Sequence, residues 1–338
     1  MLILLTVLGL VLALAYTVVN GFHDAPNAVA LPVRARALTP KVGVVLSALV
    51  NVAGVGAAAY LLSDWAIVGA PVPQDVVGSA AVVCALATTV AWNLLTWWWG
   101  LPSSSTTALF GGLIGALLGG HAVGLVATSP LTPTALVQVL VPLVVAPALA
   151  CGLAWLLAVP LLRMHRHADV NTTAFRSRLV LATGAAAVSF GHGIMHGRRA
   201  EWVFATLLVC AGLPSPIEGG TAPWLVLLVA AGLATGTLFG GWRIAYTLSS
   251  RMITIDPFRG AVAQGVAGSL LFLGGTVVPV SLSTSQTTAA AVLGAGMQQR
   301  FRTVNARVLT RVLVVWALTV PVCGLVGAVL LLALSPLL

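Results

Sequence analysis

Apolar runs long enough, or nearly long enough, to cross a lipid bilayer recur along this whole sequence. The hydrocarbon core of a bilayer is about 30 Å thick, and about 20 helical residues span it. Because 59% of the residues are hydrophobic and only 7% are charged, the chain lacks the polar surface of a water-soluble globule. We therefore expect an all-α polytopic membrane protein, since helices satisfy their own backbone hydrogen bonds in lipid. The main runs are residues 42–62, 77–95, 135–162, 224–239 and 309–334.

The first 19 residues form a further apolar stretch. No basic residue precedes its apolar core, whereas a secretory signal peptide carries positive charge at that place. We therefore expect this stretch to be a first membrane helix that stays in the mature protein.

The basic residues predict how the chain crosses the membrane. They gather in four groups between the apolar runs, and the positive-inside rule places such groups in the cytoplasm. The connections at residues 63–76, 119–133 and 213–223 contain no Lys or Arg and are expected outside. Although the net charge is +9, the scattered groups form no continuous basic face, which argues against nucleic acid as a partner. The groups are Arg34, Arg36 and Lys41; Arg163, Arg166, Arg176 and Arg178; Arg243, Arg251 and Arg259; and Arg300, Arg302, Arg307 and Arg311.

Two polar segments interrupt the apolar sequence. Ionisable residues are costly at membrane depth, so they normally face a cavity, a substrate or one another. Function is therefore expected at these two places. The first polar segment, residues 20–28, reads Asn-Gly-Phe-His-Asp-Ala-Pro-Asn-Ala, and the second polar segment, residues 191–200, reads Gly-His-Gly-Ile-Met-His-Gly-Arg-Arg-Ala.

Each polar segment is followed by a tract rich in hydroxyl groups. The first hydroxyl tract, residues 101–107, reads Leu-Pro-Ser-Ser-Ser-Thr-Thr, and the second, residues 280–288, reads Val-Ser-Leu-Ser-Thr-Ser-Gln-Thr-Thr. The same order thus occurs on both sides of a polar stretch. We expect an N-terminal membrane repeat at residues 1–162, a cytoplasmic linker at 163–178 and a C-terminal membrane repeat at 179–338. The charge-based topology gives equivalent helices opposite directions, which predicts two inverted-topology repeats.

An inverted repeat predicts where a ligand binds. Transporters of this kind hold the ligand near the bilayer midplane, between discontinuous or re-entrant helices, and expose it by moving one part against the other. Backbone amides at the start of a half-helix bind anions, and Ser or Thr hydroxyls add hydrogen bonds. A carboxylate such as that of Asp24 suits a hard cation. An anion and a coupling cation are therefore expected to share one polar centre.

At these residues the chain resembles the inorganic phosphate transporter family, in particular its bacterial low-affinity members. The family carries duplicated Asn-Asp signatures and Pro-Val-Ser-Ser-Ser or Pro-Val-Ser-Thr-Thr tracts, and the resemblance covers nearly the whole chain. It implies secondary transport of inorganic phosphate, driven by a proton or sodium gradient. By position it implies a ligand site with Asp24, Asn27, Ser104, Ser105, Thr106, Ser283, Thr284 and Ser285, in which Asp24 and Asn27 form a possible Na⁺ or coupling site.

The second polar segment departs from the family pattern. Met195-His196 stands where the family has Asn-Asp, and Arg198-Arg199 stands where Gln-Lys is common. The loss of one carboxylate weakens the case for Na⁺, because an imidazole is a poor ligand for that ion. His196 is instead a candidate to carry a coupling proton or to contact phosphate, so H⁺ is favoured over Na⁺. Arg199 is a further candidate ligand, since its planar donors suit phosphate oxygens.

Structural roles compete with these assignments. Asp24 could pair with Arg198 or Arg199, and Arg199 could be an anchor at the membrane interface. His23 and His192 could be buried histidines with only structural hydrogen bonds. Ser and Thr residues also bridge membrane helices without binding a ligand.

Three functions remain open from the sequence. A phosphate symporter in a prokaryotic plasma membrane is favoured, since the compact chain has no long soluble insertion. The replaced second carboxylate leaves sulfate or another oxyanion as an alternative cargo, and a degenerate oxyanion-binding sensor or partner is the third possibility. An enzyme is not expected, because no nucleophile with a paired base, metal cluster or nucleotide loop is recognisable. No cofactor is expected besides a coupling ion; the other expected partners are membrane lipid and a possible second copy of the chain in a homodimer.

Overall fold

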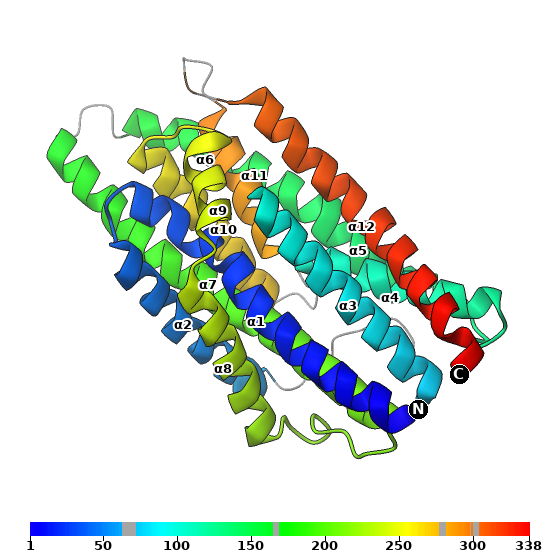
Figure 1. Ribbon diagram of the computed structural model, residues 1–338. Coiled ribbons are helices and arrows are strands. Elements are labelled where there is room, and N and C mark those ends of the chain that lie inside the picture. The colour runs from blue at the N-terminus through cyan, green and yellow to red at the C-terminus, as the bar shows by residue number, and fades with distance from the viewer. Residues whose placement is uncertain (63–71, 165–168, 277–281, 298, 300–303) are drawn as a thin grey trace.

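The computed structural model shows a bundle of helices (Figure 1). It describes residues 1–62, 72–164, 169–276, 282–297, 299 and 304–338. Arg166, Arg300 and Arg302 of the basic groups, and Val280 and Ser281 of the second hydroxyl tract, lie outside these ranges. The helices are α1 (Leu2–Arg34), α2 (Pro40–Leu61), α3 (Val76–Trp99), α4 (Ser105–Ala122), α5 (Pro133–Leu140), η1 (Val141–Val145), α6 (Ala146–Met164), α7 (Val170–Cys210), α8 (Pro223–Phe239), α9 (Trp242–Tyr246), η2 (Thr247–Arg251), α10 (Pro257–Thr276), α11 (Thr284–Gly296), α12 (Ala306–Leu334) and η3 (Ser335–Leu337).

The apolar runs of the sequence correspond to helices of this bundle. Among the described residues, six stretches are long and apolar enough to cross a membrane: α1, α2, α3, Pro133–Met164, α7 and Ala306–Leu337. A seventh span results if α8 and Trp242–Arg251 are taken together; these are bent by 55° around Gly240 and Gly241, whose backbones are left-handed. The expected all-α polytopic membrane protein is confirmed.

The two polar segments lie within α1 and α7, which run side by side in opposite directions. Gly9 in α1 contacts Leu207 near the end of α7, whereas Asp24, farther along α1, lies beside His192. Both polar segments are helical throughout. Apart from the hydrogen bond that Pro26 cannot donate, their backbone hydrogen bonds therefore stay internal, and most of the polarity that they bring into the bundle comes from their side chains.

A buried glutamine of α10 supports α1 where a proline weakens it. Pro32 has no N–H, so the carbonyl group of Ala28 loses its partner within the helix. Gln264 Nε2 donates to that carbonyl oxygen at 3.2 Å and lies 3.3 Å from the carbonyl oxygen of Asn27. α1 therefore continues through the proline, and α10 holds the turn that carries Asn27.

The helices α4 and α11 begin inside the hydroxyl tracts. Ser104 Oγ accepts a hydrogen bond from the Thr107 N–H, and Ser283 Oγ accepts one from the Gln286 N–H, so both serines are N-caps. Both caps are buried within the bundle. Two helix N-termini thus lie inside the protein, as the prediction of discontinuous helices requires.

Two helix pairs approach closely through glycine. A methyl group added to Gly236 of α8 would lie 1.9 Å from the carbonyl oxygen of Val18 in α1, and one added to Gly193 of α7 would lie 2.3 Å from the carbonyl oxygen of Asn51 in α2. The contact of α1 with α8 therefore has a counterpart in the contact of α7 with α2. Such a counterpart is what the inverted repeat predicts, although the inversion and the repeat boundaries stay predictions.

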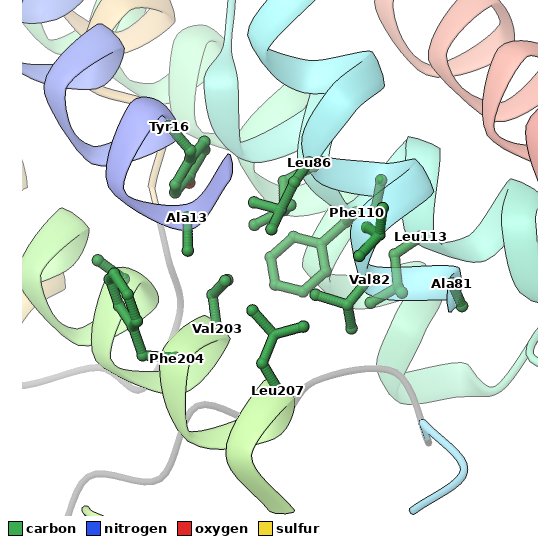
Figure 2. Packing of buried hydrophobic residues seen from close by; sticks show 14 of the residues in the cluster. Ala13, Tyr16, Ala81, Val82, Leu86, Phe110, Leu113, Val203, Phe204 and Leu207 are labelled. Atoms are coloured by element: carbon green, nitrogen blue, oxygen red, sulfur yellow. The ribbon is translucent and has the colours of Figure 1, made fainter. Parts of the chain in front are cut away.

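An apolar core joins α1, α3, α4 and α7 next to the polar segments. Its side chains interlock from all four helices, and the phenol ring of Tyr16 lies at its edge (Figure 2). The labelled members are Ala13, Tyr16, Ala81, Val82, Leu86, Phe110, Leu113, Val203, Phe204 and Leu207.

The end of α1 and the starts of α7 and α12, which carry described members of the basic groups, lie at the end of the bundle away from the start of α1 (Figure 1). Arg34 lines the same hollow as Asp256, and Arg251 and Arg311 line another hollow. This end is the one predicted to be cytoplasmic. Of the predicted linker, residues 163–164 end α6 and residues 170–178 begin α7.

Candidate substrate and ion site

Asp24 lies at the centre of a buried polar cluster formed by α1, α7 and α11. Its Oδ1 accepts a hydrogen bond from Ser285 Oγ at 2.7 Å and faces His23 Nδ1 at 3.1 Å. Its Oδ2 faces His196 Nε2 at 3.3 Å and His192 Nε2 at 3.5 Å. Three imidazoles and one hydroxyl group therefore surround a single carboxylate, all of them buried.

His196 links Asp24 to Arg199. Its Nε2 faces Asp24, and its Nδ1 lies 3.4 Å from Arg199 Nη1. A guanidinium group only donates hydrogen bonds, so Nδ1 must accept and the ring hydrogen belongs on Nε2. This assignment satisfies both contacts with a neutral His196 that donates to Asp24.

The ring of His192 stacks on that of His196, with centroids 4.2 Å apart, but its hydrogen-bond partners differ from those of His196. Its Nδ1 lies 3.1 Å from Asn51 Oδ1, and Asn51 Nδ2 donates to Thr237 Oγ1 at 2.9 Å. The hydrogen of a neutral His192 therefore belongs on Nδ1, and its Nε2 presents a lone pair to Asp24. Two acceptors 3.5 Å apart form a place where one small cation, including a proton, can be shared.

The donor atoms of Asp24, His192 and His196 lie within 4.8 Å of one another, so by distance these three residues could hold one ion together. Two of the three donors are imidazole nitrogens. Nitrogen donors suit a proton or a transition-metal ion better than a hard ion such as Na⁺, which prefers oxygen.

The second hydroxyl tract reaches both polar segments. Asn27 Nδ2 donates to Ser285 Oγ at 2.9 Å and lies 3.4 Å from Asp24 Oδ1, while its Oδ1 is buried without a partner. Thr284 Oγ1 lies 3.5 Å from His196 Nε2. Ser283 does not join these contacts through its side chain, which caps α11. The predicted residues Asp24, Asn27, Thr284, Ser285 and His196 are therefore brought together.

The first hydroxyl tract approaches the cluster from the side of His23. Ser103 Oγ lies 3.3 Å from His23 Nε2 and 2.8 Å from Thr96 Oγ1. Of the predicted residues in this tract, Ser104 caps α4, and Ser105 and Thr106 follow in the buried first turn of that helix. The tract thus connects to Asp24 through Ser103 and His23, which are neighbours of the predicted set.

Arg199 is the largest side chain that is fully buried among the described residues. The interpretation as an interfacial anchor is therefore wrong. Its Nη1 contacts His196, whereas its Nε and Nη2 have no hydrogen-bond partner. The described ion pairs of Asp24 are with histidines rather than with Arg198 or Arg199. A buried guanidinium group without a carboxylate partner is costly unless an anion joins it.

Comparison with known proteins identifies the family of this chain. The model of the Phosphate transporter family matches residues 20–327, which include both polar segments and both hydroxyl tracts. This chain belongs to that family.

Relatives of the family resemble this chain over most of its length. A probable low-affinity inorganic phosphate transporter of Bacillus subtilis is 29% identical, covering 97% of this chain and 96% of the relative. Another of Mycobacterium leprae is 32% identical, covering 96% of this chain and 77% of the relative. A solved structure titled the sodium-dependent phosphate transporter has the same fold, with a TM-score of 0.76 and 19% identity, covering 99% of this chain and 100% of that chain.

Membership in the phosphate transporter family confirms the resemblance that the polar segments and hydroxyl tracts indicate. It also confirms that the protein is a transporter rather than an enzyme, in keeping with a multi-pass protein of the plasma membrane.

The sequence-based site omitted several residues that the structure adds to the cluster. Asn51 and Thr237 hold His192, and Gln264 holds the turn of Asn27. Asn51 carried a signal, because it is a single amide within the apolar run 42–62. His192 carried another, because it lies one helical turn before His196. Neither feature of the sequence indicates that Asn51 and His192 contact each other.

Proposed function

We propose that this protein carries inorganic phosphate across the plasma membrane by secondary active transport coupled to a cation gradient. The observation that supports it most is the buried cluster in which one carboxylate, Asp24, and one guanidinium group, Arg199, are joined through His196. Both charged groups are buried. The carboxylate of Asp24 would bind a cation, and the guanidinium group of Arg199 would bind an anion. In a member of the phosphate transporter family, such a cluster suits the binding of phosphate together with a coupling ion.

Phosphate is proposed to bind between Arg199 and the starts of α4 and α11. Arg199 provides the positive charge, and the hydroxyls of Ser104, Ser105, Thr106, Ser283, Thr284 and Ser285 lie at or next to the two helix N-termini. The first turns of α11 hold further unpartnered buried polar atoms, on Gln286, Thr287 and Thr288. Unlike fully ionised sulfate, phosphate near neutral pH retains a hydrogen that it can donate to an acceptor such as Asp24.

The proposed coupling ion is H⁺ rather than Na⁺. The support is the donor set, since Asp24 faces imidazole nitrogens where a second carboxylate would suit Na⁺. The lone pair of His192 and the Oδ2 of Asp24 provide the place for the proton. The charged or titratable groups around this place are His23 on α1 and His196 and Arg199 on α7. Alternating exposure of the cluster to the two sides of the membrane completes the proposal.

Uptake of radiolabelled phosphate into proteoliposomes tests the proposal, with a pH gradient and a Na⁺ gradient imposed separately. We expect the pH gradient to drive uptake and Asp24→Asn to abolish it, because an amide cannot accept the proton. Asp75→Asn is the matched control, since Asp75 is exposed at the start of α3 and Asn also caps helices. It is expected to keep wild-type uptake.

Other outcomes separate the alternatives. Uptake driven only by the Na⁺ gradient would show that the coupling proposal is wrong while phosphate transport holds. Competition by sulfate as strong as that by phosphate would favour a general oxyanion carrier. Phosphate binding without counterflow in folded protein would favour a sensor that does not transport.

A further inference from the structure

The free edge of Arg199 has the shape of an oxyanion ligand. Nη1 is used by His196, and the two nitrogens left without a hydrogen-bond partner are Nε and Nη2. These two N–H groups lie in the guanidinium plane, point in the same direction and match two oxygens of a tetrahedral anion in a bidentate contact. The edge is fully buried, so water from outside does not satisfy it.

Tyr16 supplies a third unsatisfied donor at the same place. Its side chain is fully buried, its hydroxyl group has no hydrogen-bond partner, and its nearest polar neighbours are the side chains of Arg199 and Asn20. Asn20 Oδ1 already accepts a hydrogen bond from Asn93 at 3.3 Å. A buried phenol hydroxyl normally has a partner, and its absence costs roughly 1–3 kcal/mol.

The two residues come from neighbouring helices and meet because α1 and α7 are antiparallel. Residues that precede Asp24 in α1 lie beside residues that follow His196 in α7, as the contact of Gly9 with Leu207 also shows. Tyr16 and Arg199 therefore lie on the side of Asp24 toward the start of α1, which is the side predicted to face outward.

The charges nearby favour an anion there rather than a cation. Arg199 is positive, and its neighbour His196 already donates its ring hydrogen to Asp24. The acidic residue next along α7, Glu201, is engaged by Thr221 at 3.2 Å and lies 4.0 Å from Arg198. Three donors without an acceptor, all buried, are the complement of phosphate oxygens.

We propose that Tyr16 Oη and the Nε–Nη2 edge of Arg199 form a seat for phosphate on the outward side of Asp24. The proposal rests on the proposed phosphate transport and adds Tyr16 as a residue that contacts the cargo. In this seat the guanidinium edge binds two phosphate oxygens and the phenol donates to a third. Phosphate arriving from outside reaches this seat before the hydroxyl groups of α11, and Asp24 lies on its inward side.

Binding of radiolabelled phosphate to the purified full-length protein tests the seat with Tyr16→Phe, which removes one oxygen atom. We expect the dissociation constant for phosphate to rise about tenfold, since a hydrogen bond to a charged ligand is lost. The melting temperature without phosphate is expected to stay the same or rise, because an unsatisfied buried hydroxyl is removed. A purely structural role would instead lower that melting temperature.

Tyr60→Phe is the matched control, because Tyr60 is 60% exposed in α2. It is expected to leave phosphate binding unchanged. Unchanged phosphate affinity in Tyr16→Phe, with the wild-type protein binding phosphate, would overturn the seat alone. A folded wild-type protein that neither binds nor transports phosphate would overturn the proposed function, and the seat with it.

Discussion

At the scale of single residues, Arg199 is the most unusual feature of the bundle. A guanidinium group that is fully buried in a membrane protein needs an anion, and the part of the chain that the structure describes supplies no carboxylate to it directly. Arg199→Lys keeps the charge but loses the bidentate edge. We expect it to weaken phosphate binding at least tenfold, measured by the same radioligand assay. Affinity equal to that of the wild type would mean that charge alone suffices.

The hydrogen bond from Gln264 to the Ala28 carbonyl group, one helical turn before Pro32, predicts a compensation between two mutations. Gln264→Leu leaves the buried carbonyl group of Ala28 without a donor and is expected to lower the free energy of unfolding by about 1–3 kcal/mol. Pro32→Ala restores an N–H that can bond to Ala28 within α1. The double variant should therefore lose less stability than the sum of the single variants, measured by thermal unfolding in detergent. Additive losses would refute this account.

At the scale of helices, the close contact of α1 with α8 depends on the absence of a side chain. Gly236→Ala would place a methyl group 1.9 Å from the carbonyl oxygen of Val18, so the two helices must separate. We expect a clear fall in melting temperature and loss of phosphate uptake. Gly56→Ala on α2 is the control, since a methyl group there meets nothing within 4 Å and alanine favours helix. Equal effects of the two substitutions would contradict the packing described.

The sequence predicted the helices and half of the candidate site for a physical reason. Long apolar runs permit little but membrane helices, and Asp24 and His196 stand out as ionisable residues between apolar runs. The resemblance to the family added Asn27, Thr284 and Ser285 by position. These five are in fact gathered around one carboxylate.

The remaining site residues depend on which helices pack together, and no local pattern states that. Gln264 meets the backbone of Asn27, and Tyr16 meets Arg199, across helices far apart in the sequence. A tyrosine in an apolar run is usually a packing residue, and its unsatisfied hydroxyl becomes visible only when its neighbours are placed.

At the scale of the whole molecule, the described basic groups gather at one end of the bundle, which fixes a testable orientation. Two variants with one added cysteine each test it, Glu218→Cys in the connection between α7 and α8 and Asn171→Cys at the start of α7. Both positions are exposed. In intact cells, a membrane-impermeant maleimide is expected to label the first variant and not the second, by the positive-inside rule. The native Cys84, Cys210 and Cys323 are buried, whereas Cys151 is partly exposed, so the native protein without added cysteines is the background control. Labelling of the Asn171→Cys variant and not of the Glu218→Cys variant would show that the chain has the opposite orientation in the membrane.

The bridge from Asp24 through His196 to Arg199 has an electrical consequence. The negative charge of Asp24 and the positive charge of Arg199 are separated only by the imidazole ring of His196 and its contacts to the two groups. The transmembrane voltage acts on a charge in proportion to its displacement through the field, by about 2.3 kcal/mol per 100 mV for a full crossing. Opposite charges that move together feel opposite forces. A motion of α1 and α7 that carries this pair through the membrane field is therefore electrically silent, and any current during turnover reports only the cargo and its coupling ion.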